Sequence, residues 1–326
     1  MERNKVSVII PIFKVEKFIE RCVHSLMVQT LQEVEYIFVD DATPDKSLEM
    51  LQACLVQYPN RKTTILKHPQ NQGLPAARNT GLALATGEYI FHCDSDDYVE
   101  PHMLEKLYGK ARETNADIVW CDWFLSFEKN ERYMKQPHYE TSIDALKGIL
   151  CGAMKYNVWN KLVKRSLYVD NDILFPSGHG MGEDMTMIRL FACAQKVAYI
   201  PQAFYHYVKL NGAAFTNTFS DRHLMDIKFN VDETTAFIYS KVGSEMDTYL
   251  SLFKLNVKYP FIISDQWDMY KLWSEWYPEV NKFIVRNPYG SFRSRVLQYA
   301  AWMKQYWVLW LHYKLVYKFV YGILYQ

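Results

Sequence analysis

Short apolar runs alternate with stretches of helical periodicity through residues 6–125. The runs are rich in β-branched and aromatic side chains, and we expect strands at 6–13, 34–39, 63–67, 88–93 and 117–124. Amphipathic stretches of helix length separate them, at 15–29, 46–57, 74–85 and 101–114. Such alternation builds βαβ units, so the sequence predicts an α/β fold with a mostly parallel central sheet flanked by helices on both faces.

The rest of the chain is organised differently. A polar stretch at 128–142 interrupts the alternation and predicts a loop or an exposed hairpin. Helical segments follow at 143–151 and 183–195, and from about residue 221 onward the periodicity is helical and the composition unusually aromatic. We therefore expect two halves of one α/β domain and a helical C-terminal region, at 1–125, 126–220 and 221–326.

The formal net charge of +1 conceals an uneven distribution. No acidic residue follows Glu279, whereas seven Lys and Arg residues do, so this tail carries +7 and residues 1–279 carry −6 (30 basic minus 36 acidic). Nucleic-acid binding is not expected, because the basic tail is short and the body is acidic. The six cysteines form no metal-like cluster, and the N-terminal apolar run is too short for a signal peptide. We expect a cytosolic chain with reduced cysteines.

Aromatic and aliphatic residues recur at helical spacing through residues 297–326. The set is Trp302, Tyr306, Leu309, Trp310, Tyr313, Val316, Tyr317 and Val320, interspersed with Lys304, Lys314 and Lys318. Charges interrupt the run too often for a transmembrane helix, which needs ~20 consecutive apolar residues. Aromatic rings with basic residues and no acid are typical of a helix that lies on an anionic membrane surface. A helix that packs on its own domain or on a partner chain is the alternative.

Ligands of open α/β sheets bind beyond the carboxyl ends of the strands, here Pro11–Phe13, Asp40–Asp45 and Asp94–Asp97. Asp94 and Asp96 form a D-x-D pattern on extended chain, where both side chains project to the same side. Crowded carboxylates repel one another unless a cation or hydrogen-bond donors compensate them. Mg²⁺ or Mn²⁺ suits oxygen ligands, and needs only one or two protein carboxylates when substrate phosphates complete the shell. Asp97 is expected to point the other way, toward helix 101–114, as a structural cap.

Several stretches of the sequence resemble the motifs of one protein family. They are VSVIIPIFKVEKFIERCVHSLMVQT, VEYIFVDDATPDKS, NQGLPAARNTGLALATGEYIFHCDSDDYVEP, and NVWNKLVKRSLY with GHGMGEDMTMI. Over about residues 5–210 the chain resembles the family 2 glycosyltransferases of the GT-A fold, which is a Rossmann-like fold for nucleotide-diphospho-sugar transferases. The resemblance implies transfer of a hexosyl or N-acetylhexosaminyl group from a nucleotide diphosphate sugar, usually UDP-linked, to an acceptor hydroxyl with inversion.

The resemblance also implies an acceptor and a place of action. The expected acceptor is a glycan or lipid-linked glycan in the synthesis of a cell-surface polysaccharide, such as capsule or lipopolysaccharide. The expected location is the cytoplasm, at the inner face of the cell membrane, where residues 297–326 would provide the contact.

On the donor side, the resemblance places the base and ribose beside Pro11, Ile12 and Phe13. Asp41 would accept a hydrogen bond from the uracil N3–H, although Asp40 and Asp41 could instead cap the turn DDATPD. The sequence departs from the family's motifs at two places. The usual DDGSTD reads DDATPD here, and the usual PxYN reads PIFK. The lost Gly and Asn remove common contacts, so nucleotide affinity or base preference could differ.

Further donor contacts follow from the same motifs. Asn71 and Arg78 correspond to residues that contact the nucleotide and its phosphates, and an always charged guanidinium suits a diphosphate. The alternative for Arg78 is an exposed helical charge. Asp96 corresponds to the most direct metal ligand, and Asp94 to the residue that reaches the ribose, the sugar or, through water, the Mn²⁺ or Mg²⁺ ion.

On the acceptor side, GED at 182–184 matches the family's base motif. It makes Asp184 the general base and Glu183 a neighbour that orients the acceptor. The alternative is structural, because acidic residues in a first helical turn favour the helix dipole.

Four more residues have weaker assignments. Trp159 and Lys161 match a segment near the donor and acceptor sugars, where an aromatic face can stack on a pyranose. A core Trp and a surface Lys are the alternative. His206 and Lys209 could reach the diphosphate or the metal, although a lone His is more often structural.

Other enzyme classes fit less well. A nucleotidyltransferase would need a Gly-rich, Arg-containing N-terminal loop, and a Rossmann dehydrogenase would need G-x-G-x-x-G after the first strand; neither pattern occurs here. A catalytically inactive relative that serves as a scaffold in a membrane glycan-assembly complex is the non-enzymatic alternative. The joint presence of Asp41, Asp94, Asp96 and Asp184 speaks against it.

Overall fold

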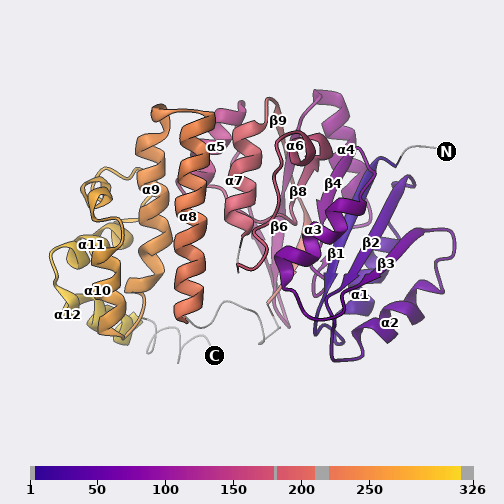
Figure 1. Ribbon diagram of the computed structural model, residues 1–326, viewed down its shortest axis with the longest axis horizontal. Helices are drawn as coiled ribbons and strands as arrows, with labels where there is room; N and C mark the ends of the chain where they lie inside the picture. Colours follow the sequence, from indigo (N-terminus) through magenta and orange to yellow (C-terminus); the bar gives the residue numbers. More distant parts are fainter. Residues whose placement is uncertain (1–3, 180–181, 210–219, 317–326) are drawn as a thin grey trace. The chain divides into compact units, whose positions relative to one another are not determined.

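The computed structural model describes residues 4–179, 182–209 and 220–316 (Figure 1). The chain divides into two compact units. The first comprises Met1–Leu146 with Lys155–Phe237, and the second comprises Lys147–Met154 with Ile238–Gln326. The expected halves 1–125 and 126–220 lie in the first unit except for residues 147–154, and this unit also takes residues 221–237 of the expected C-terminal region. One strand, Ile118–Ser126, runs across the expected boundary at residue 125.

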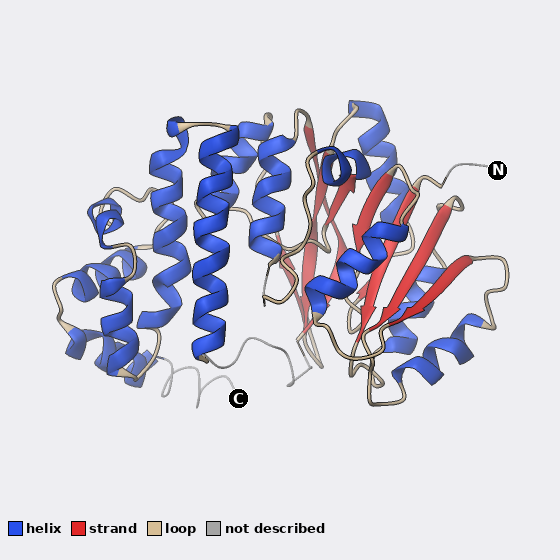
Figure 2. Cartoon of the chain, viewed as in Figure 1, coloured by secondary structure: helices blue, strands red, loops and turns tan. Residues whose placement is uncertain are grey.

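Among the described residues, nine strands form one sheet in the first unit (Figure 2). They are β1 Val6–Ile12, β2 Val34–Asp40, β3 Lys62–Lys67, β4 Tyr89–His92, β5 Tyr98–Val99, β6 Ile118–Ser126, β7 Glu131–Met134, β8 Lys161–Lys164 and β9 Val197–Val208. The order is β3-β2-β1-β4-β8-β6-β9-β5, with β7 paired to β6. Strands β1, β2, β3, β4, β6 and β9 all run in the same direction, and β8, β5 and β7 run opposite to them. The expectation of a mostly parallel sheet is confirmed.

The central strands are buried along their whole length. Every residue of β1 and of β2 is buried, as expected for parallel strands covered on both faces, whereas the edge strand β3 is partly exposed. The helices of this unit are α1 Ile19–Met27, α2 Ser47–Leu55, α3 Leu74–Leu84, α4 Met103–Thr114, α6 Arg165–Asp170 and α7 Glu183–Cys193. Figure 1 shows α3 and α6 on one face of the sheet and α1 and α4 on the other.

Three strands were not expected from the sequence. Strand β8 lies between β4 and β6 and is antiparallel to both, β9 pairs along nearly the whole of β6, and the two-residue β5 pairs with β9. The pattern of β9 is irregular because Pro201 cannot donate to the ladder, and the register with β6 shifts around Asp122. The polar stretch at 128–142 contains β7, which forms a hairpin with β6, one of the two structures predicted for it.

The second unit is helical, as predicted. Its helices are α9 Asp247–Lys258, α10 Trp267–Glu275, α11 Phe292–Trp302 and α12 Tyr306–His312, while α5 Ser142–Leu150 and α8 Asp221–Lys241 each contribute a part. Phe253, Phe261, Tyr270 and Trp273 are fully buried in its core. Within the described residues, no helix combines the length and the apolar character needed to cross a membrane.

The cysteines are free, as expected for a reducing environment. Cys22, Cys93, Cys121 and Cys151 are buried, and Cys54 and Cys193 are partly exposed. Burial raises the pKa of the Cys151 thiol to about 12, so that side chain is an inert part of the core.

Candidate active site

The loop after β4 is anchored to the end of β1 and to β9. Ser95 Oγ donates to the carbonyl of Pro11 at 2.6 Å, and the backbone N–H of Asp94 donates to Tyr205 Oη at 3.1 Å. These bonds fix the D-x-D segment at the carboxyl edge of the sheet, where the sequence predicts a ligand site.

Asp97 holds the loop, but through a different element from the one predicted. Its buried carboxylate accepts a hydrogen bond from Tyr205 Oη at 2.8 Å and one from the backbone N–H of Val208 at 2.7 Å. Burial and the nearby Asp96 and Asp94 raise its pKa well above the usual range. Asp97 is therefore structural, as expected, although it ties the loop to β9 and does not cap helix α4.

Arg78 joins the carboxylates of two distant segments. Its guanidinium lies on α3, is 1% exposed, and donates to Asp94 Oδ1 at 2.8 Å and to Glu183 Oε1 at 2.6 Å. Burial alone lowers the pKa of an arginine, but the two carboxylates outweigh it and raise the pKa of Arg78, so it stays charged. The burial of Arg78 rules out the alternative of an exposed helical charge. Its guanidinium bonds two protein carboxylates in this structure, and a contact to the donor phosphates stays a prediction.

The neighbouring residue on α3 secures the segment that leads to α7. Asn79 donates through Nδ2 to the carbonyl of Phe175 at 2.8 Å, and its Oδ1 accepts from the Phe175 N–H at 2.9 Å. A Cβ on Gly182 would lie 2.0 Å from the Pro176 ring, so only glycine fits immediately before α7. These contacts fix the position of the first turn of α7, which contains Glu183 and Asp184.

Asp184 is half-buried and titrates near neutrality. Its Oδ1 accepts a hydrogen bond from the backbone N–H of Met185 at 2.8 Å. Burial raises its pKa to about 7, the Met185 bond opposes that rise, and the negative charge of Glu183 adds to it. A carboxylate whose pKa lies near the operating pH can take a proton from a hydroxyl and release it again.

The D-x-D carboxylates fit a cation that takes most of its ligands from elsewhere. Burial raises the pKa of Asp94 to about 6, Arg78 opposes this shift, and the charges of Glu183 and Asp96 add to it. One oxygen of Asp94 is used by Arg78. In the described part of the chain no three His, Cys, Asp or Glu side chains gather to hold a metal by themselves. Asp94 and Asp96 therefore suit Mg²⁺ or Mn²⁺ only if phosphate oxygens and water complete the coordination.

Asp41 is fully engaged by a loop of its own protein. Its buried carboxylate accepts four hydrogen bonds, from His68 Nδ1 at 2.7 Å, Asn71 Nδ2 at 2.9 Å, and the backbone N–H groups of Gln72 and Gly73 at 2.8 Å each. A carboxylate has about four acceptor positions, so a uracil N3–H would have to replace one of these donors. Asn71 likewise supports the loop in this structure.

Asp40 and the end of β1 complete the donor side. Asp40 Oδ1 accepts a hydrogen bond from the Thr43 N–H at 2.8 Å, which is the turn cap considered for it. Pro11 and Ile12 are buried, whereas the ring of Phe13 is 40% exposed directly beyond the strand. Phe13 is therefore available for stacking on a base.

Trp159 and Lys161 are both buried and make contacts within the protein. Trp159 stacks on Tyr205 with a centroid distance of 4.4 Å and on Tyr207 at 5.4 Å. Lys161 donates to the carbonyls of Lys155 and Asn157 and to Asn160 Oδ1, at 2.9, 2.7 and 2.8 Å. Trp159 thus matches the core Trp alternative, whereas Lys161 is not the surface Lys considered beside it. A place of either side chain near the donor and acceptor sugars stays a prediction.

His206 is structural, and Lys209 is exposed. The imidazole of His206 lies between Glu131 at 2.7 Å and Glu100 at 2.9 Å and stacks on Tyr98 with centroids 4.2 Å apart. These contacts hold β9 against β5 and the β7 hairpin.

Tyr207 and His68 belong to the site although sequence reasoning did not select them. Burial raises the pKa of Tyr207 to about 12, and the charges of Asp97, Asp94, Asp96 and Glu183 add to it, so its hydroxyl lies in the field of these carboxylates. Strand alternation beyond Tyr205 could have revealed Tyr207 once β9 was recognised. Nothing local distinguishes His68, because its partner Asp41 lies 27 residues away.

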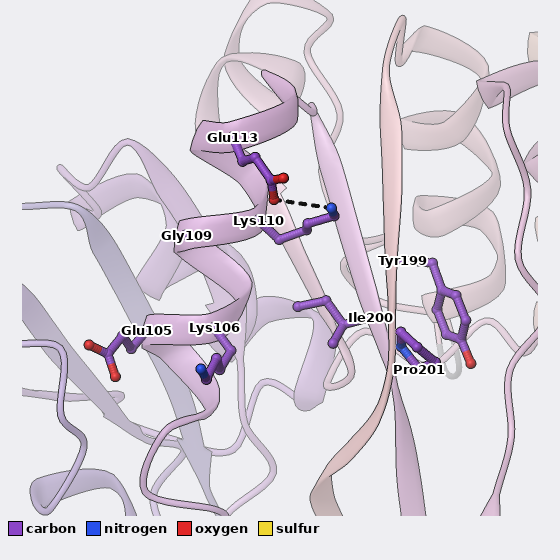
Figure 3. A pocket seen from close by; sticks show the side chains of 8 residues that line it. All are labelled: Glu105, Lys106, Gly109, Lys110, Glu113, Tyr199, Ile200 and Pro201. Atoms are coloured by element: carbon purple, nitrogen blue, oxygen red, sulfur yellow. Dashed lines mark hydrogen bonds and ion pairs between the residues drawn. The ribbon is translucent and has the colours of Figure 1, made fainter.

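A pocket of 510 Å³ lies elsewhere in the first unit (Figure 3). Residues of α4, among them Lys106, Gly109 and Lys110, line it together with Tyr199, Ile200 and Pro201 of β9. Lys110 pairs with Glu113 at 3.1 Å within this lining. None of the carboxylates described above borders it, so it is not the candidate active site.

Comparisons with known proteins agree with this geometry. The model of "Glycosyl transferase family 2" matches residues 7–188. EpsJ, an uncharacterized glycosyltransferase of Bacillus subtilis, is 34% identical over 62% of this chain and 60% of its own length. Glycosyltransferase GlyG of Streptococcus pneumoniae is 30% identical over 68% of this chain and 76% of its own.

A solved structure extends the similarity to the whole fold. The S. aureus TarS fragment 1–349, determined in complex with UDP-GlcNAc, superposes with a TM-score of 0.72 at 19% identity, and the match covers 95% of this chain and 91% of that one. With the family model over more than half of its length and the GT-A-like sheet in place, the chain belongs to glycosyltransferase family 2.

Proposed function

We propose that the chain is an inverting, metal-dependent glycosyltransferase that moves a sugar from a UDP-sugar to a hydroxyl of a glycan or lipid-linked glycan. The observation that carries the proposal is the arrangement around Arg78, which bonds Asp94 of the D-x-D segment and Glu183 beside Asp184 at once. A donor-side carboxylate and the carboxylate next to the candidate base are thereby held by one buried cation.

The donor would bind along the carboxyl edge of the sheet. The exposed ring of Phe13 would contact the base, and Asp41 with Asn71 would contact it after giving up part of the 71–73 loop. A divalent cation held by Asp96 and Asp94 would neutralise charge that develops on the departing diphosphate. UDP is proposed as the nucleotide because the similar TarS fragment has been determined with UDP-GlcNAc.

The acceptor would bind beside Asp184. Its hydroxyl oxygen forms a bond to the anomeric carbon, the bond from that carbon to the diphosphate oxygen breaks, and the hydroxyl proton passes to the Asp184 carboxylate. One displacement of this kind inverts the anomeric centre. Arg78 holds Glu183 beside Asp184, and the negative charge of Glu183 adds to the raised pKa of Asp184, which makes the Asp184 carboxylate a stronger base.

The acceptor class sets the proposed place of action. A lipid-linked acceptor would be met at the cytosolic leaflet, so a peripheral position on the inner face of the cell membrane belongs to the proposal. Synthesis of a cell-surface polysaccharide is the process in which such a transfer takes part.

The test is a panel of UDP-sugars, assayed for hydrolysis and transfer with Mg²⁺, with Mn²⁺ and with EDTA. We expect one donor to be turned over only with metal, and Asp96→Ala to abolish turnover. Asp170→Asn, which changes an exposed carboxylate at the end of α6, should leave it intact. UDP binding without any turnover of any donor would instead identify an inactive scaffold. Full activity of Asp96→Ala would refute the metal assignment.

A further inference from the structure

Helix α11 in the second unit exposes apolar side chains on one face and buries the opposite face. Leu297 and Ala301 are buried. An exposed row consists of Phe292, Val296, Tyr299 and Met303, the residue directly after α11, and Phe292 is 82% exposed. Their spacing of four, three and four residues places them in a single row along the helix. Trp302, which is also exposed, lies beside this row. A row of this kind is unusual on a surface that faces only water.

Helix α12 repeats the pattern. Leu309 is fully buried, whereas Trp307, Trp310 and Leu311 are exposed, and Trp307 is 60% exposed. Tyr306 packs inward, with its ring 5.7 Å from that of Tyr270. The exposed face of α12 is therefore not the row predicted from the sequence, in which Tyr306 and Leu309 were members. Tyr317, Lys318 and Val320 of that row lie outside the described residues.

Basic residues lie close to these rows in the sequence. The second unit has 12 basic and 6 acidic residues, hence +6, whereas the first unit has 25 and 30, hence −5. Exposed basic side chains near the rows in sequence are Lys282, Arg286, Arg293 and Lys304. The acids of the second unit all precede the rows, and Asp265, Asp268 and Glu279 are paired with Lys314, Lys271 and Lys254. The charge of the rows is thus not offset by acids of their own segment.

We propose that this aromatic-basic surface binds the surface of an anionic lipid bilayer. The aromatic-basic surface comprises Phe292, Val296, Tyr299, Met303, Trp307, Trp310 and Leu311 with Lys282, Arg286, Arg293 and Lys304. Trp and Tyr rings prefer the headgroup region, the aliphatic side chains enter the acyl boundary, and the basic residues pair with lipid phosphates. The chain lies on the membrane and does not cross it, in agreement with the absence of a spanning helix among the described residues.

A bilayer is favoured over a second copy of the chain by charge. Two copies that met through this surface would bring like charges together, which is unfavourable. An anionic leaflet offers the opposite charge over its whole area. The proposed membrane binding does not depend on sugar transfer, so either proposal can be refuted without the other.

The test is co-sedimentation of the full chain with vesicles of phosphatidylcholine alone and of phosphatidylcholine with 30% phosphatidylglycerol. We expect binding to the anionic vesicles, and loss of that binding on raising the salt concentration. Each removed basic residue should weaken it about fivefold, tested with Arg286→Ser and Arg293→Ser. Phe292→Ser with Tyr299→Ser, and separately Trp307→Ser with Trp310→Ser, should each reduce it further.

The matched control is Val56→Ser with Leu84→Ser, two exposed apolar residues of the first unit, which should bind vesicles as the unchanged chain does. Circular dichroism of each variant verifies that the helices are retained. Equal binding of the aromatic variants and the unchanged chain would overturn the proposal. So would a concentration-dependent dimer that the same substitutions abolish in the absence of lipid.

Discussion

Replacing Arg78 by alanine tests the link between the two halves of the site. The substitution leaves Asp94 and Glu183 facing each other, with Asp96 nearby, in a place that is partly shielded from water. Removal of one partner from a fully buried ion pair costs about 3–5 kcal/mol. The two carboxylate side chains keep 23% and 27% of their surface exposed, so solvent screening lowers the expected loss to about 2–4 kcal/mol.

The pH dependence of this loss identifies its cause. Burial already holds the pKa of Asp94 above its unfolded value, at about 6, and without Arg78 it would rise further. A carboxyl with a raised folded pKa loses stability as pH increases from its unfolded pKa through its folded pKa. The destabilisation by Arg78→Ala should therefore be larger at pH 8 than at pH 5, where the Asp94 carboxyl is largely protonated.

Urea unfolding followed by circular dichroism at both pH values measures the effect. The control is Arg112→Ala, which removes an exposed ion pair with Glu88 and should leave the free energy of unfolding nearly unchanged at either pH. A loss from Arg78→Ala that equals the control, or that is the same at pH 5 and pH 8, would refute the reasoning about unpaired carboxylates.

Three other substitutions separate structural from ligand-binding roles. In the pH profile of the transfer rate, Glu183→Gln should shift the rising limb, expected near pH 7, to lower pH, because Glu183 adds to the raised pKa of Asp184. An unshifted profile would count against this coupling. Lys161→Met should lower the free energy of unfolding by about 1–3 kcal/mol but change the KM for the donor less than about tenfold. A larger rise in KM at unchanged stability would instead indicate a contact to the donor sugar. Asp41→Ala should lower both the thermal stability and the UDP affinity, measured by calorimetry, because it removes the carboxylate that accepts four hydrogen bonds. Lost affinity at unchanged stability would indicate a base contact alone.

The first half of the fold could be predicted because its signals are local. Strands β1, β2 and β4 are continuous apolar runs, and α3 follows its own periodicity, so both the mostly parallel sheet and the position of the D-x-D loop follow from short windows. Strand β9 was not predicted because Pro201 and the register shift break its alternation, and without that strand Tyr207 had no distinguishing feature.

The roles within the site were harder to predict, because they depend on contacts between distant residues. Arg78 bonds partners 16 and 105 residues away, and no local pattern distinguishes such an arginine from one that binds phosphate. Lys161 resembles a surface lysine in sequence, and its burial depends on carbonyls that converge only in the folded chain. The assignments of Asp184 and Asp96 rest on matches to short sequence motifs, so they did not require knowledge of such contacts.

The most direct test of the central claim compares transfer and UDP binding in the same samples of the unchanged chain and of Asp184→Asn. We predict that the asparagine variant binds UDP with unchanged affinity in the presence of Mg²⁺ or Mn²⁺ but loses a factor of about 10²–10⁴ in kcat for transfer. The unchanged chain should gain activity as pH rises through about 7, where the carboxyl of Asp184 loses its proton. Transfer by the variant at the rate of the unchanged chain would contradict the assignment of Asp184 as the general base.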